Sequence, residues 1–69
     1  MNARPTVSPE EILGVERLPL TLTVAQAAKL VGVSRPTMYR AIEEGEFPHL
    51  KVRGRLMVPT NRLLDLLFS

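Results

Sequence analysis

The chain has 69 residues, of which 45% are hydrophobic, and its formal net charge is only +2. A chain of this length forms one small domain with a limited core. It contains no cysteine, which excludes a disulfide framework and a cysteine-ligated zinc site, and its single histidine, His49, cannot form a metal site alone. No apolar run approaches the ~20 residues that span a bilayer, and the N-terminus lacks the basic-then-apolar pattern of a signal peptide. We therefore expect a cytoplasmic protein without a membrane segment, a metal or a cofactor.

Catalytic patterns are also missing from the sequence. No nucleophile has a matching base, no cluster of ligands suits a metal, and no glycine-rich loop suits a phosphate. The chain is therefore predicted not to be an enzyme. Positive charge is local: acidic and basic residues balance over residues 1–33, whereas Lys51, Arg53, Arg55 and Arg62 lie in a stretch without an acid.

The N-terminal segment differs in composition from the rest of the chain. Three of the six prolines lie within residues 1–19, and Ser8 with Glu11 can begin a helical turn that reaches Leu13. We predict a flexible arm over residues 1–19 and a folded domain over residues 20–69. The apolar residues of the arm could instead dock on a neighbouring subunit or on another protein, and the sequence does not decide between these alternatives.

A first helix of the folded domain is predicted between Thr23 and Gly32. Thr23 and Gln26 form a capping box, in which each side chain satisfies a backbone N–H at the helix start. Gly32 stands where a helix end needs a positive φ, and Val33 supplies the apolar contact that often accompanies such an end. The turn that follows is therefore expected to be sharp.

A second helix is predicted from Ser34, which can cap it, to about Glu44, and Gly45 stops it. Helical spacing places Met38 and Ile42 inward, together with Ala41. The remaining positions face outward or lie on the flanks: Arg35, Pro36, Thr37, Tyr39 and Arg40.

Two short helices joined by a tight turn are typical of a helix-turn-helix, whose second helix faces DNA. In this arrangement the outward residues of the second helix would contact DNA. Each arginine also has a simpler interpretation as a solvated surface charge. For Tyr39, a half-buried ring with its hydroxyl in water and a contact to phosphate are both open.

A β-hairpin is predicted over residues 49–59, with two short strands around Gly54. Arg53 and Arg55 would project from the tip of this wing, where guanidinium groups reach phosphates or a narrow minor groove. The alternative is that these cations, with Lys51, only keep an edge strand soluble. The residues expected to point inward are Leu50, Val52, Leu56 and Val58.

A last helix is predicted after Pro59, which ends the second strand, with Thr60 as its cap. Leu63, Leu64, Leu67 and Phe68 recur at helical spacing and would close the core. Leu66 and Phe68 lie near the terminus, where exposure would offer a contact to a second protein. The central core is expected to contain Leu30, Met38, Ile42, Val52, Leu56 and Leu64.

The chain resembles the small excisionases, also called recombination directionality factors, which have a MerR-like winged helix-turn-helix fold. The resemblance covers residues 20–68. It rests on six segments, which in chain order are Leu22-Thr-Val-x-x-Ala-Ala, Leu30-x-Gly-Val-Ser34, Tyr39-Arg40, Gly45-x-Phe-Pro48, Gly54-Arg55 and Val58-Pro59. The implied fold is mainly α with a small β-hairpin. The resemblance further implies direct repeats of DNA as binding sites, bending of that DNA, and redirection of an integrase from insertion to excision.

Carried over by position, the resemblance implies that Pro36, Thr37 and Arg40 meet the major groove, that Tyr39 meets the backbone, and that Arg53 and Arg55 form the wing contact. The chain departs from the family pattern at two positions. Met57 replaces a second basic residue of the wing, which weakens the wing contact. Pro36 replaces a small polar residue, which places direct readout mostly on Thr37 and Arg40. The full set of predicted DNA-binding residues is Ser34, Arg35, Pro36, Thr37, Tyr39, Arg40, Lys51, Arg53, Gly54 and Arg55.

Three functions are compatible with this module. The favoured one is an architectural DNA-binding protein that assembles cooperatively on tandem sites and helps an integrase to excise a mobile element. The alternatives are a small transcriptional regulator of a mobile element and a DNA-binding antitoxin, which would use the arm and the leucine-rich last helix. The sequence does not give the target site, the bend or the oligomer size.

Overall fold

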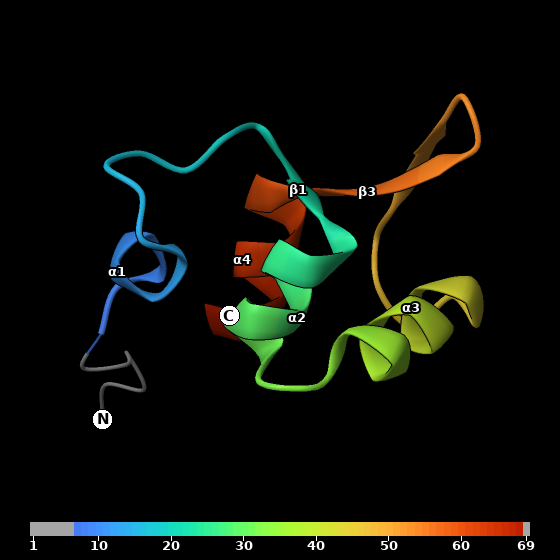
Figure 1. Ribbon diagram of the computed structural model, residues 1–69, viewed down its shortest axis with the longest axis horizontal. Coiled ribbons are helices and arrows are strands. Elements are labelled where there is room, and N and C mark those ends of the chain that lie inside the picture. Colours follow the sequence, from blue (N-terminus) through green and yellow to red (C-terminus); the bar gives the residue numbers. More distant parts are fainter. Residues whose placement is uncertain (1–6, 69) are drawn as a thin grey trace.

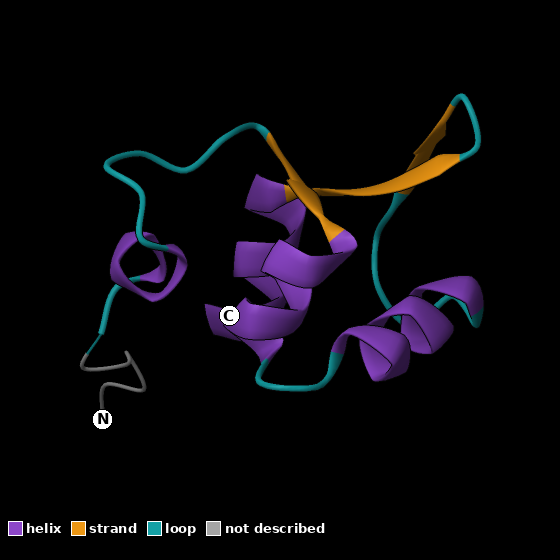
Figure 2. Cartoon of the chain, in the orientation of Figure 1, coloured by secondary structure: helices purple, strands orange, loops and turns teal. Residues whose placement is uncertain are grey.

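The computed structural model describes residues 7–68, and residues 1–6 of the predicted arm lie outside this range. Four helices and one three-stranded antiparallel sheet make up the described part (Figures 1 and 2). This arrangement confirms the predicted winged helix-turn-helix. The elements in chain order are α1 (Pro9–Leu13), β1 (Thr21–Thr23), α2 (Val24–Val31), α3 (Arg35–Glu43), β2 (Leu50–Val52), β3 (Arg55–Pro59) and α4 (Thr60–Phe68).

Side-chain caps fix the two helices of the helix-turn-helix. The Thr23 hydroxyl accepts from the backbone N–H of Gln26 at 3.1 Å, and the Gln26 side chain accepts from the backbone N–H of Thr23 at 3.0 Å. Gly32 ends α2 with a φ of 90°, where a side chain would be strained. Ser34 caps α3. These features confirm the predicted caps and the sharp turn between the helices.

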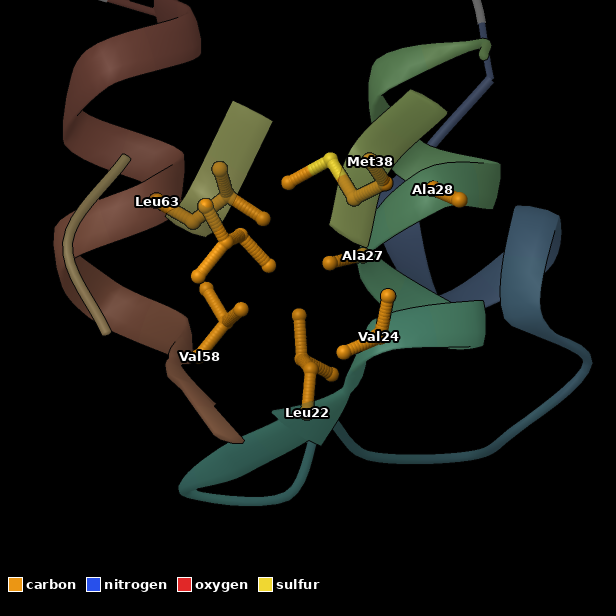
Figure 3. Packing of buried hydrophobic residues seen from close by; sticks show 8 residues of the cluster. Leu22, Val24, Ala27, Ala28, Met38, Val58 and Leu63 are labelled. Atoms are coloured by element: carbon orange, nitrogen blue, oxygen red, sulfur yellow. The ribbon is translucent and has the colours of Figure 1, made fainter. Parts of the chain in front are cut away.

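The core lies between the sheet, α2, α3 and α4 (Figure 3). Met38 and Ile42 of α3 are fully buried, as predicted, and so is Val58 of β3. Leu30 and Leu56 are partly buried against this cluster. The buried residues of the cluster are Leu22, Val24, Ala27, Ala28, Met38, Ile42, Val58 and Leu63.

The inward face of the hairpin was predicted wrongly for β2. Leu50 and Val52 are 47% and 54% exposed, so Val52 is not a core residue. The turn consists of two residues, and Val52 therefore pairs with Arg55 across it. Since side chains alternate along a strand, this register puts Leu50 and Val52 on the face opposite to Leu56.

Two further details differ from the sequence prediction. On α4 the buried hydrophobic residue is Leu63, whereas Leu64 is only partly buried and lies outside the core cluster. Thr60 is the first residue of α4 rather than a separate cap, and its hydroxyl donates to the carbonyl of Pro19 at 2.6 Å. This bond and the backbone bond from Thr60 to Leu20 attach the end of the arm to the sheet and α4.

The arm contains α1, the helical turn that the sequence predicts up to Leu13. Ser8 and Glu11 form a capping box, and Gly14 ends the helix with a φ of 72°. Leu13 packs against the core, and α1 contacts α2. The mobility of the arm in solution stays a prediction, which these contacts make testable.

Candidate nucleic-acid interface

The outward face of α3 is polar and open to solvent. Arg35, Pro36, Tyr39, Arg40 and Glu43 line a shallow hollow of about 360 Å³ on this face. The helical spacing of these residues explains their grouping, because positions three and four apart lie on one side of a helix. This face of α3 therefore presents two guanidinium groups, a phenol and one carboxylate to solvent.

The start of α3 is held by the two hydroxyl groups of its first turn. The Ser34 hydroxyl accepts from the backbone N–H of Thr37 at 3.3 Å and donates to the Thr37 hydroxyl at 2.8 Å. Both residues are exposed. The Thr37 hydroxyl thus has a defined orientation at the N-terminal end of α3. In a recognition helix, the residues of this end contact base edges.

The wing owes its shape to a tight turn between β2 and β3. Arg53 and Gly54 both have positive φ, 52° and 76°, which is the signature of a type I′ turn. Val52 and Arg55 flank the turn as the last pair of the hairpin. Arg53 and Arg55 are therefore carried at the tip, exposed to solvent.

A groove of about 570 Å³ joins the wing to the helix-turn-helix. It brings together five predicted residues from two separate elements: Arg35 and Tyr39 of α3, and Arg53, Gly54 and Arg55 of the wing. The other lining residues are Thr23, Val24, Ala25, Leu56 and Met57. None of these ten residues is acidic, so three guanidinium groups give the groove a positive potential.

Tyr39 lies on one wall of this groove with 46% of its surface exposed. The ring is thus half-buried, and both interpretations of Tyr39 fit its position. A ring anchored in this way holds its hydroxyl at a fixed place beside cations.

Other predicted residues lie outside the groove. Pro36 and Arg40 are on the hollow of α3. Lys51 pairs with Leu56 in the hairpin and is exposed. Arg62, the remaining cation of the basic stretch, lines a different hollow beside Pro48 and His49.

Sequence reasoning missed one charged residue of the α3 surface. Glu43 shares the α3 hollow with Arg40. The signal was present in the sequence, because Glu43 stands three residues after Arg40 on the same helix. A carboxylate at this position reduces the positive potential at the end of α3, so the strongest field lies toward the wing.

Residues 7–68 contain neither a cluster of potential metal ligands nor a helix suited to span a membrane. No group of three or more histidine, cysteine, aspartate or glutamate residues comes together there as a metal site would require. The helices of that range are too short or too polar to cross a bilayer.

Comparison with known proteins identifies the module. A family model described as "Helix-turn-helix domain" matches residues 21–67. Uncharacterized proteins from Mycobacterium bovis and Mycobacterium tuberculosis are 50% identical to this chain over 36 residues. The matched part is 52% of this chain and 32% of each relative, so the chain spans about a third of their length. No solved structure matches the chain.

Proposed function

This chain belongs to the helix-turn-helix domain family, and from that premise we propose that it is a sequence-specific, architectural DNA-binding protein that acts as an excisionase. It binds tandem sites and directs an integrase toward excision of a mobile element. The observation that carries the proposal is the acid-free groove in which Arg35 and Tyr39 of α3 meet Arg53 and Arg55 of the wing. A DNA backbone that runs between a major-groove helix and a wing needs such a groove.

The roles of the site residues follow from their positions. In the proposed complex α3 enters the major groove, where Arg40 pairs with guanine and Thr37 and Pro36 meet neighbouring base edges. The groove receives the phosphate backbone, with Arg35, Tyr39, Arg53 and Arg55 as contacts and Lys51 as a further cation. Ser34 positions the start of α3, and Gly54 permits the turn of the wing.

Tandem binding is proposed because the interface of one copy is small. A single DNA-binding module buries roughly 600–1,000 Å² of protein surface, which limits its specificity. One helix and one wing recognise a short site only. Several copies that bind cooperatively read a longer sequence, and together they can hold a bend that brings distant recombinase sites close to each other.

The test of the excisionase function is a recombination assay. The DNA substrate carries the two end sites of the integrated element, and the recombinase encoded beside it is supplied with or without this protein. We expect excision only when the protein is present. Arg40→Ala should abolish the stimulation, whereas Lys29→Ala, at an exposed position of α2 outside the groove, should retain it.

Unchanged recombination would refute the excisionase function. In that case a transcription assay with the recombinase gene deleted tests the alternative regulator. A change in promoter activity on addition of the protein would then assign the DNA-binding module to transcriptional control.

A further inference from the structure

The outer face of the sheet carries apolar side chains that are exposed to solvent. Leu50 and Val52 are about half exposed there, and they line a hollow of about 520 Å³ with Thr21 and Met57. Arg53 and Arg55 also line this hollow, so its rim is cationic. An apolar hollow with a charged rim is typical of a protein contact.

A complementary surface lies on α1. Ile12 of α1 is 37% exposed, Val7, two residues before the helix, is 44% exposed, and Glu10 and Glu11 give the first turn of α1 a negative charge. The helix is held in place because Leu13 packs against the core. This surface is therefore a small apolar patch with carboxylates, which matches the hollow in both polarity and charge.

The two surfaces lie at opposite ends of the molecule. Figure 1, in which the longest axis is horizontal, shows α1 at one end and the wing at the other. The α1 helix of one copy therefore cannot occupy the hollow of the same copy. A contact between such different surfaces of two copies is heterologous, and it leaves a free hollow and a free α1 at which further copies can add.

We propose that the hollow on the outer face of the sheet receives α1 of a second copy of this chain, with Ile12 against Leu50 and Val52 and with Glu10 and Glu11 near Arg53 and Arg55. Each guanidinium has five N–H donors, so Arg53 and Arg55 can contact these carboxylates and a DNA phosphate at the same time. This inference rests on the proposed function only in that DNA aligns the copies. The contact between α1 and the hollow is the interaction through which tandem copies bind cooperatively. The contact itself exists without DNA.

The first experiment measures cooperativity on DNA with two adjacent sites. Val52→Ser weakens the hollow and Ile12→Ser weakens α1, and neither changes the charge. Leu66→Ser, on α4, is the matched control because Leu66 is also 54% exposed. Coupling energies of ordinary size raise affinity for the second site about 5- to 150-fold. We expect this factor to fall to about one in Val52→Ser and Ile12→Ser and to persist in the control, with single-site affinity unchanged in all three.

The second experiment tests the pairing of the two surfaces without DNA, by nuclear magnetic resonance at high protein concentration. Labelled Val52→Ser protein, which keeps α1, is mixed with unlabelled Ile12→Ser protein, which keeps the hollow. The α1 signals should shift. They should not shift with unlabelled Val52→Ser protein, which lacks the hollow.

The possible results separate the proposals. Loss of cooperativity with normal single-site affinity, together with α1 shifts in the complementary mixture, supports the contact. Full cooperativity in either variant, or α1 signals that do not move, overturns it. A symmetric contact between two hollows would appear as an effect of Val52→Ser alone and would also overturn it. Absent single-site affinity would refute DNA binding, and the mixing experiment would still decide the contact between copies.

Discussion

At the scale of single residues, Arg53 adopts an unusual backbone conformation. Its φ of 52° lies in the left-handed region, which costs a residue with a Cβ about 1–2 kcal/mol. Asparagine followed by glycine is the preferred pair for a type I′ turn, and here an arginine occupies the first position. Strained positions gather at functional sites. The long cationic side chain at the wing tip is consistent with the proposed phosphate contact.

Arg53→Asn should therefore separate stability from binding. Asparagine tolerates the left-handed conformation better, so we expect the free energy of unfolding to rise by about 0.5–1 kcal/mol. DNA affinity should fall, because one guanidinium of the groove is lost. Urea unfolding and a binding titration on the same sample measure both effects. Equal stability of the two proteins would contradict the strain argument, and equal affinity would contradict the phosphate contact.

Arg40 and Arg55 should differ in the kind of binding that they support. Arg40→Ala should cost about 1–3 kcal/mol on the cognate site and much less on random DNA, because it removes a contact to a base. Arg55→Ala should weaken both complexes about equally, because it removes a contact to the backbone. Affinities for both DNAs at the same salt concentration measure the difference. An unchanged ratio in Arg40→Ala would show that α3 is not the reading element.

At the scale of elements, local signals predicted the helices well, and pairing geometry explains the errors in the sheet. Caps such as Thr23 with Gln26 act within four residues, so a single segment of sequence contains them. The face of a strand depends instead on the pairing across the turn. A turn centred on Gly54 alone would align Leu50 and Val52 with Leu56, whereas the observed turn of two residues shifts them to the other face.

The strand β1 could not be predicted for a related reason. Only three residues form it, and it exists because Leu22 pairs with Val58 about half the chain away. The groove could not be predicted from a local sequence pattern either. Its arginines were identified from the sequence, but their meeting with Tyr39 depends on how the wing folds back toward α3.

The arm offers a prediction at this scale. Leu13 packs against the core, whereas Ile12, on the same helix, is 37% exposed. If α1 is docked in solution, Leu13→Ala should lower the free energy of unfolding by about 1–2 kcal/mol, and Ile12→Ala should lower it by less than about 0.5 kcal/mol. Denaturant unfolding of both variants measures this. Equally small effects would support the flexible arm that the sequence predicts.

At the scale of the whole molecule, the proposed interface predicts a salt dependence. The net charge of the chain is only +2, but five cations lie on α3 and the wing: Arg35, Arg40, Lys51, Arg53 and Arg55. Each phosphate contact releases counterions, so the logarithm of the binding constant should fall with the logarithm of salt concentration at a slope of roughly −3 to −5. Titrations at several salt concentrations measure the slope. An affinity that hardly changes with salt would rule out this set of contacts.

The length of the molecule predicts the spacing of the tandem sites. Its longest extent is 38 Å, and one turn of DNA is about 34–36 Å long. Copies joined through α1 and the outer face of the sheet should therefore bind sites about one turn apart, because whole turns keep them on the same side of the duplex and the 38 Å extent spans one turn. In a mobility-shift series, sites about 10 base pairs apart should fill together without an intermediate complex. Insertion of half a turn, about 5 base pairs, moves the second site to the opposite side and should leave two independent binding steps. Equal cooperativity at both spacings would refute a rigid contact between neighbouring copies.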